Sequence, residues 1–375
     1  MVWTEESNES DSSATLIDLA NSPVLQHVVH LDMAGYPLGS GGAVIALATS
    51  KHLENLSSLD LTFSEMGDEG GIAIANSRGF RKLITLELVS CSIGARGARA
   101  IARSKYLTHL RWLSLRQNRI GPKGAKAIAE SPTFAKLETL NIGECDLGEE
   151  GAVAIATSKT LTGLAALDLS HTPLSDKAVH AIANSPTLGN LTGLYLDYCD
   201  IGEGGAAAIA NSPKLQNLSL LFLGNNPIGG AGAIALASTT TLTNLETLDL
   251  SDAHLGGTEI RVILTSPAFA SLTTLGLSFN YVSDEMGMLL AKARVLKNLE
   301  FVDLRNCGTS DTVIAAILQS KKLTQLQQLL VLECDLDEES CRKLLERFAE
   351  KLDVDRDTGP HYPHDPLDMF GEPFA

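Results

Sequence analysis

The stretch from residue 83 to residue 109 reads LITLELVSCSIGARGARAIARSKYLTH and contains two different apolar periodicities. In its first part Leu86 and Leu88 are separated by one residue, which is the period-two pattern of a short strand with one buried face. In its second part Ala98, Ile101 and Ala102 follow the i, i+3, i+4 spacing of a helix face. The stretch therefore predicts a strand followed by a helix.

The same pattern recurs along most of the chain as LxxLxLxx(N/C)x(L/I)G, followed by GAxAIA, a serine and an apolar residue. The blocks begin at Val28, Leu56, Leu83, Leu110, Leu137, Leu164, Leu191, Leu218, Leu245, Leu272, Leu299 and Leu326. A single strand and helix cannot bury both of their apolar faces, whereas stacked copies form one continuous core. We therefore expect an α/β solenoid of about twelve 27-residue repeats, with parallel strands on the concave wall and helices on the convex wall.

These motifs resemble those of the ribonuclease-inhibitor-like leucine-rich repeat proteins. The GAxAIA helix motif is also similar to that of GALA-type bacterial repeat effectors, but residues 1–27 leave no room for the F-box of that family. The resemblance implies a horseshoe-shaped, non-enzymatic scaffold for protein–protein interaction. It leaves two alternatives open: a GTPase-activating (RanGAP-like) regulator, with Arg116 or Arg119 as the suggestive positions, and a host-directed bacterial effector or ubiquitin-ligase adaptor of the GALA type without an F-box.

The periodicity also predicts the division of the chain. We expect a disordered acidic segment over 1–14, a capping half-repeat over 15–27, the repeat array over 28–352 and an acidic, proline-containing tail over 353–375. The end of that tail could cap the last block or act as a docking peptide. The carboxylates of Asp353, Asp355 and Asp357 are spaced as in a calcium loop, but the glycine and the required glutamate are out of place. A solvated tail is therefore the preferred interpretation.

The composition and short motifs of the chain indicate its cellular compartment and whether it has enzymatic activity. The acidic amino terminus is unlike a secretion signal, no run of eighteen apolar residues is present, and six cysteines are too few for a disulfide scaffold. These features predict a cytoplasmic protein without a membrane span, although delivery into a host cell by a specialised route stays open. No phosphate-cradling loop or nucleophile motif stands apart from the repeat, so we expect no enzymatic activity, cofactor or metal. The family resemblance implies that the side chain at the ninth block position turns inward and satisfies backbone groups. Five cysteines fall at this position: Cys91, Cys145, Cys199, Cys307 and Cys334.

Block positions three, five and seven should point out of the concave sheet, with position eight at its rim. The residues that we predict to bind a partner protein there are Trp112, Arg116, Asp168, His171, Tyr195, Asp197, Tyr198, Leu220, Phe222 and Asp249. Exposed aromatic residues ringed by polar groups are typical of binding hot spots. We expect Tyr195, Tyr198 and Phe222 to be apolar anchors. The alternative is that the aromatic side chains pack against each other along the ladder without a ligand.

Position five is acidic in three consecutive blocks, at Asp32, Asp60 and Glu87. Like charges on neighbouring strands repel, so a basic partner would stabilise this row. Screening by solvent and salt is the alternative.

The net charge of −16 is unevenly distributed. Residues 81–136 hold twelve basic and two acidic side chains, a net +10, which leaves −26 for the rest of the chain. We name five of these residues the basic collar, because their helical spacing places them on the convex side: Arg96, Arg99, Arg103, Lys123 and Lys126. An acidic protein surface, a phosphate-bearing partner or the acidic half of another copy would fit the collar, whereas the acidic balance of the whole chain makes nucleic acid an unfavourable partner.

Overall fold

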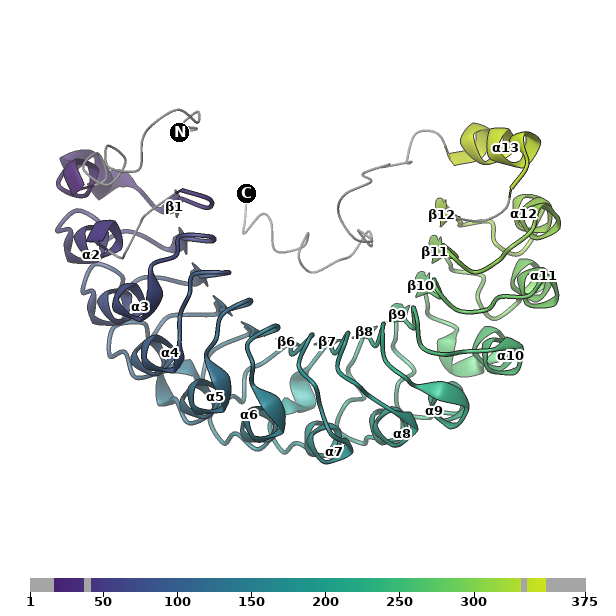
Figure 1. Cartoon of the computed structure of the whole chain (residues 1–375), viewed down its shortest axis with the longest axis horizontal. Helices are drawn as coiled ribbons and strands as arrows, with labels where there is room; N and C mark the ends of the chain where they lie inside the picture. The colour runs from purple at the N-terminus through teal and green to yellow at the C-terminus, as the bar shows by residue number, and fades with distance from the viewer. Residues whose placement is uncertain (1–16, 37–41, 332–335, 349–375) are drawn as a thin grey trace. The chain divides into compact units, whose positions relative to one another are not determined.

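The computed structural model describes residues 17–36, 42–331 and 336–348, in which short strands alternate with helices (Figure 1). The chain divides into two compact units, Met1–Leu191 and Thr192–Ala375, here called unit 1 and unit 2. The predicted terminal segments 1–14 and 353–375, with their calcium-like motif, and Cys334 lie outside the described residues.

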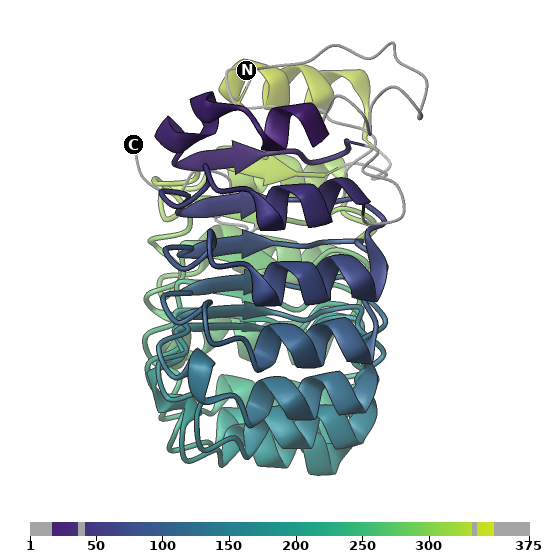
Figure 2. The same ribbon diagram turned by 90° about the vertical axis from the view of Figure 1, so that its left-hand side faces the viewer.

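The described part of unit 1 contains six strands in sequence order. They are β1 (His30–Asp32), β2 (Ser58–Asp60), β3 (Thr85–Glu87), β4 (Trp112–Ser114), β5 (Thr139–Asn141) and β6 (Ala166–Asp168). The α-helices between and after them are α2 (Gly42–Thr49), α3 (Gly67–Asn76), α4 (Ala95–Ala102), α5 (Gly121–Ala129), α6 (Gly148–Ala156) and α7 (Asp176–Ala183). Short 3-10 helices are η1 (Pro23–His27), η2 (Pro132–Phe134) and η3 (Leu188–Asn190). Figure 2 shows the strands and helices of this unit stacked layer upon layer.

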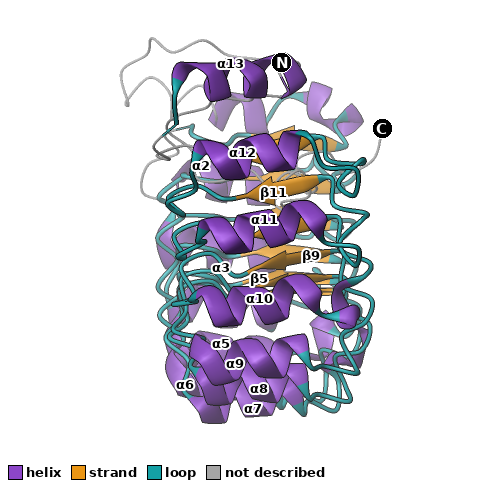
Figure 3. Cartoon of the chain, turned by 90° about the vertical axis from the view of Figure 1, so that its right-hand side faces the viewer, coloured by secondary structure: helices purple, strands orange, loops and turns teal. Residues whose placement is uncertain are grey.

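Unit 2 repeats the plan. Its strands are β7 (Gly193–Tyr195), β8 (Leu220–Phe222), β9 (Thr247–Asp249), β10 (Thr274–Gly276), β11 (Phe301–Asp303) and β12 (Gln328–Leu330). Its helices are α8 (Glu203–Ala210), α9 (Gly229–Ala237), α10 (Gly257–Thr265), the 3-10 helix η4 (Pro267–Phe269), α11 (Asp284–Lys292), α12 (Asp311–Leu318) and α13 (Glu338–Phe348). In Figure 3 the helices α10, α11 and α12 cover one side of this unit's strands.

Each strand begins two residues after a predicted block start, and neighbouring strands within a unit pair in parallel register. Leu59 pairs with Leu86, Leu86 with Leu113, and Leu113 with Leu140, and all four side chains are fully buried. A fully buried leucine contributes about 2 kcal/mol relative to an exposed one. The fold class is therefore the predicted repeat solenoid, with parallel strands on one face and helices on the other.

Small residues let the helices of successive repeats pack closely. A Cβ atom on Gly71 of α3 would lie 3.2 Å from the Cα atom of Gly97 in α4, so the two backbones are nearly in contact there. A serine after several of the helices links neighbouring repeats: the Ser104 hydroxyl donates to the Ala75 carbonyl at 2.6 Å, and that of Ser131 donates to the Ala102 carbonyl at 2.5 Å. These contacts position the strands, and hence the side chains on their other face.

The ninth block position points inward, as predicted. The Cys91 and Cys145 thiols donate to the carbonyls of Leu61 and Leu115 at 3.0 and 2.9 Å. The Asn118 side chain occupies the same place in its own repeat and donates to the Leu88 carbonyl at 2.7 Å. Burial raises the pKa of Cys91 to about 11 and that of Cys145 to about 12, so both are protonated structural residues. Cys199 and Cys307 are also buried.

The eighth position has the same unusual backbone in ten repeats. Its non-glycine residues adopt left-handed φ angles: Phe63, Ser90, Gln117, Glu144 and His171 in unit 1, and Tyr198, Asn225, Asp252, Phe279 and Asn306 in unit 2. Because the angle recurs with every type of side chain, it belongs to the repeat turn and not to one site. We call this row of side chains the rim.

Candidate functional site

The face of the strands opposite the helices is the candidate binding surface in each unit, and we call it the helix-free face (Figure 1). Leucines at block positions four and six are buried beneath it, so positions three, five and seven carry its side chains. The predicted partner-binding residues of unit 1 are Trp112, Arg116, Asp168 and His171, and those of unit 2 are Tyr195, Asp197, Tyr198, Leu220, Phe222 and Asp249.

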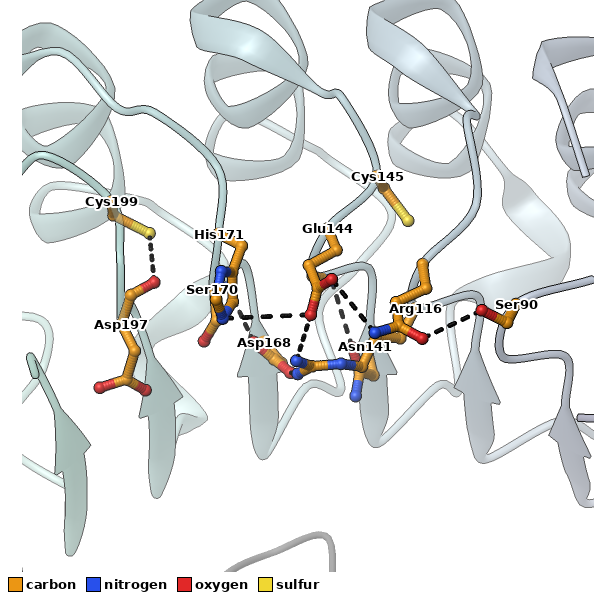
Figure 4. Close-up of polar contacts among 12 residues, drawn as sticks. Ser90, Arg116, Asn141, Glu144, Cys145, Asp168, Ser170, His171, Asp197 and Cys199 are labelled. Carbon is orange, nitrogen blue, oxygen red and sulfur yellow. Dashed lines mark hydrogen bonds and ion pairs between the residues drawn. The ribbon is translucent and has the colours of Figure 1, made fainter. Parts of the chain in front are cut away.

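A polar network joins three of the predicted residues in unit 1 (Figure 4). The Arg116 guanidinium forms an ion pair with Glu144 and lies 3.5 Å from the Asp168 carboxylate. The His171 Nε2 atom lies 4.0 Å from the same Glu144 oxygen. Asp168 also accepts a hydrogen bond from the Ser170 amide at 2.8 Å. The basic group that pairs with Asp168 in this structure is therefore Arg116 of the same chain.

The network leaves little of Arg116 for a ligand, because its side chain is only 20% exposed. Arg119, the other arginine singled out by the sequence, is exposed and makes no ion pair within the described ranges. Trp112 is half-buried on β4. The network is a preformed polar surface in which the carboxylates of Glu144 and Asp168 share the positive charge of Arg116.

The acidic row of unit 1 is present as predicted. Strand pairing places Asp32 opposite Asp60, and Asp60 opposite Glu87. Burial and the neighbouring Asp60 carboxylate raise the pKa of Glu87 to about 7, and burial together with Asp32 raises the pKa of Asp60. Hydrogen bonds from Ser114 and Trp112 oppose the shift of Glu87. This part of the helix-free face would gain electrostatic stabilisation from a cation.

In unit 2 the expected exposure of two aromatic anchors is wrong. Tyr195 and Phe222 are only 8% and 5% exposed, and their rings stack with centroids 4.9 Å apart. They face each other because β7 and β8 pair them directly. The tyrosine ring also folds back over Gly193, where a Cβ atom would lie 2.9 Å from its hydroxyl oxygen. The two residues therefore form a packed platform instead of protruding anchors, which is the alternative left open by the sequence.

The predicted carboxylates of unit 2 accept hydrogen bonds from other groups of this chain: Asp249 within its own turn, and Asp197 from the next repeat. Asp249 is buried and accepts hydrogen bonds from the Ser251 amide and hydroxyl at 2.9 and 2.6 Å. Asp197 accepts one from the Gly224 amide at 2.8 Å. Leu220 is half-buried at the start of β8. Asp249 is thus a turn-stabilising residue, and the expectation that it extends toward a partner is wrong.

The protruding aromatic side chains of unit 2 lie on the rim and in the loop beside it. Tyr198 is 52% exposed, Phe279 is 57% exposed and Tyr281 is 69% exposed. The sequence predicts the positions of Tyr198 and Phe279 but misses Tyr281, which stands at block position ten. The repeat could have indicated that Tyr281 is exposed. Asn280 at position nine points inward, and its neighbours Phe279 and Tyr281 on either side point outward. Large exposed aromatic groups of this kind are candidate contacts for a protein partner.

In the basic collar, Arg96 and Arg99 lie on α4, Arg103 directly follows α4, and Lys123 and Lys126 lie on α5. All five side chains are exposed. Arg96 pairs with Glu69 at 3.0 Å, whereas Arg99, Arg103, Lys123 and Lys126 make no ion pair with any residue that the structure describes. At the places equivalent to Arg99 and Lys126, the flanking helices carry the uncharged Ile72 and Val153. The collar is therefore a local basic patch on the helix-covered face of unit 1.

Among the described residues, no group of three His, Cys, Asp or Glu side chains is arranged to hold a metal ion. None of the helices in the same ranges is long and apolar enough to cross a bilayer.

Comparison with known proteins gives matches at the level of repeat and fold. Residues 52–75, 81–102, 106–129, 135–156 and 214–237 match the family model described as Leucine Rich repeat. No curated protein matches the sequence. An internalin, InlF, from Listeria monocytogenes is similar in structure with a TM-score of 0.51 and 18% identity, covering 89% of this chain and 92% of the internalin. The yeast complex of Rad7 and Elc1 contains a similar chain with a TM-score of 0.56 and 15% identity, covering 89% and 86% respectively. At these identities the likeness concerns the fold alone.

Proposed function

We propose that this chain, a leucine-rich repeat protein, is a non-enzymatic scaffold that binds a partner protein through its helix-free face and rim. The observation that carries the proposal is the one-sided architecture: the described helices cover one face of the strands, the opposite face presents a polar network, and the rim and the loop beside it carry exposed aromatic residues. Surfaces built on strands are rigid, so a partner that binds them meets preorganised side chains. Similar repeats in the yeast Rad7–Elc1 complex support a role in protein binding.

In unit 1 the contacts would be mainly polar. The Arg116–Glu144–Asp168–His171 network is already satisfied internally, so it offers a shaped surface with few free charges. The acidic row Asp32–Asp60–Glu87 would pair with basic groups of the partner.

In unit 2 the contacts would be mainly aromatic. Tyr198 and the loop bearing Phe279 and Tyr281 would be the anchors, with the Tyr195–Phe222 platform supporting the surface behind them. Exposed tyrosines supply a large contact area and a hydroxyl at a small entropic cost, because they have few rotatable bonds.

Partner capture from cell extract with matched variants tests this proposal. Tyr198→Ser and the double change Phe279→Ser with Tyr281→Ser remove exposed apolar area without touching the core. The control is Ile234→Ser, which removes 47%-exposed apolar area from α9 on the helix-covered face. We expect a partner that wild-type protein recovers to be lost with the rim variants and kept with Ile234→Ser. Equal recovery with all variants would refute the assignment of the anchors.

The basic collar is the second surface of this proposal, and an acidic or phosphate-bearing partner is the chemistry that fits it. Arg99→Glu combined with Lys126→Glu reverses two unpaired charges, and Lys159→Glu with Lys214→Glu makes an equal change elsewhere. Binding to immobilised polyglutamate should fall with the first pair, and salt should weaken it further. A loss of the same size with the second pair would mean that only net charge matters.

A further inference from the structure

A groove of about 630 Å³ lies on unit 1 between the rim and the starts of the helices. Its lining comes from the loops that follow β2, β3 and β4, which are Phe63 and Glu65, then Ser90, Ser92 and Gly94, then Gln117, Asn118 and Arg119. Block position eight is held by Phe63, Ser90 and Gln117, and block position ten by Glu65, Ser92 and Arg119. The groove is therefore built from the same places of three successive repeats.

Side-chain size explains the hollow. The middle loop has serines at both positions, whereas its neighbours have Phe63 and Glu65 on one side and Gln117 and Arg119 on the other. Ser90 and Ser92 form the floor, and the larger residues form two walls about 10 Å apart, which is two strand spacings. A cavity of this volume falls in the range of ligand-binding clefts.

Internal hydrogen bonds hold the floor and one wall in place. The Ser90 hydroxyl donates to the Gln117 side-chain oxygen at 3.0 Å, and the Gln117 amide donates to Glu144 at 3.1 Å. Beneath them the Asn118 oxygen accepts from the amides of Cys91 and Ile93 at 3.1 and 2.8 Å. The groove is thus a preorganised feature and not a gap between loose loops.

The two walls carry opposite charges that do not reach each other. The exposed Glu65 carboxylate and the exposed Arg119 guanidinium form no ion pair with one another, and neither pairs with another residue that the structure describes. Arg119 does not pair with Asp146, which holds the same position in the next repeat. The Phe63 ring, 57% exposed, stands in the same loop as Glu65, so that wall combines an aromatic face with a carboxylate. Such a pair favours a basic side chain through a cation–π contact and an ion pair.

A phosphate or another simple anion fits the groove poorly. The amide of Gly94, at the start of α4, already donates to the Asp68 carboxylate at 2.8 Å, and the Gly97 amide donates to the same oxygen at 2.7 Å. An anion beside Arg119 would also meet the field of Glu65 across the groove. The observed charges are instead complementary to a ligand with one positive and one negative group.

We propose that the groove binds an extended peptide segment of a partner protein, with a basic residue against Phe63 and Glu65 and an acidic residue against Arg119. Three residues of extended chain span about 10 Å, which matches the separation of the walls. The hydroxyls of Ser90 and Ser92 face the peptide backbone between the two charged residues. Specificity then arises from the order of charges along the segment, because the reversed order places like charges together.

The test uses the full chain and labelled nine-residue glycine–serine peptides that carry one Arg and one Glu three positions apart, in both orders. Peptides with Arg alone and Glu alone are the references. At low salt we expect wild-type protein to bind one two-charge order up to roughly fivefold more tightly than the single-charge peptides, as one additional exposed ion pair allows. Equal binding of all peptides, or binding of none, would overturn the proposal.

Variants of the groove distinguish recognition by Glu65 and Arg119 from a general effect of the net charge of the protein. Arg119→Gln should remove the preference, and Glu65→Arg combined with Arg119→Glu should reverse the preferred order while leaving the net charge unchanged. Ser90→Phe should abolish binding by filling the floor, with a side chain that the repeat already accepts at Phe63 and Phe279. Circular dichroism and thermal unfolding verify the fold of each variant. An unchanged order preference in the double variant would refute the assignment of Glu65 and Arg119. These residues are not among the predicted contacts of the helix-free face, so the two binding activities can be lost separately.

Discussion

Asn118 allows the energetic role of the ninth repeat position to be tested in detail. Its side chain is buried and makes five hydrogen bonds with the backbone. The oxygen accepts from the amides of Cys91 and Ile93, and the nitrogen donates to the carbonyls of Leu88, Leu115 and Arg116. Replacement by alanine leaves at least two buried amides without an acceptor. At about 1–3 kcal/mol for each unsatisfied group, we expect a loss of about 4 kcal/mol in the free energy of unfolding.

Asn118→Cys is the informative comparison, because cysteine already occupies this position at Cys91 and Cys145. The new thiol can donate to the Leu88 carbonyl, as the Cys145 thiol donates to that of Leu115. It cannot replace the oxygen that the two amides bind. We therefore expect this variant to be about 1 kcal/mol more stable than Asn118→Ala, one hydrogen bond being the difference.

Urea unfolding measures the overall loss, and amide hydrogen exchange locates it. The second measurement is needed because repeat proteins can open in parts, which complicates a single unfolding free energy. Exchange at Cys91 and Ile93 should accelerate in Asn118→Ala. Gln117→Ala, in the same loop but exposed, should change stability by less than about 0.5 kcal/mol. A loss below about 1 kcal/mol in Asn118→Ala, with unchanged exchange at both amides, would refute the reasoning.

Three further predictions concern pH, packing and thiol reactivity. The folded chain holds the proton of Glu87 up to about pH 7 and the unfolded chain releases it near 4.5, so stability should fall as pH rises through that window, by at most about 3 kcal/mol. Thermal unfolding across the window should show a smaller fall for Glu87→Gln, and an equal fall would contradict the assignment. Gly71→Val should cost about 1–3 kcal/mol in chemical unfolding because it forces α3 from α4, whereas Gly202→Ala, with open space around it, should cost much less. Iodoacetamide should label the exposed Cys341 before Cys91, whose burial raises its pKa to about 11, and mass spectrometry that found the reverse order would disprove this.

The strands could be predicted from the sequence because the same period-two leucine pattern recurs in twelve blocks, so a departure in one block does not obscure it. A single leucine at position four does not show which face of a strand is buried. When leucine recurs at that position in successive paired strands, the face of the sheet that carries these leucines must be the buried one. The inward direction of Cys91 and Asn118 does not follow from this register, because position nine lies beyond the strand; the resemblance to leucine-rich repeat proteins implied it. Stacked helices needed no separate signal, since the small residues at Gly71 and Gly97 recur in step with the strands.

The exposure of individual side chains on the helix-free face could not be read from position alone. Tyr195 lies in an outward-facing position, yet its ring is buried because Gly193 leaves space beside it and Phe222 stacks on it. That outcome depends on the volumes of two neighbours, one in the same strand and one in the next. Asp249 was misjudged for a related reason: its turn presents two donors from Ser251 that compete with any external partner.

Arg116 and Arg119 show how the same residue type acquires different roles within one loop. Arg116, at block position seven, extends over the helix-free face toward Glu144 in the next repeat and Asp168 two repeats on, so its charge is used inside the molecule. Arg119, at position ten, stands beside Ser92, which is too short to meet it and carries no charge. A repeat that varies freely at position ten can thus create a charged groove without altering its core. Because the walls of that groove come from different repeats, replacing Glu65 or Arg119 should change ligand preference and leave the free energy of unfolding within about 0.5 kcal/mol of wild type.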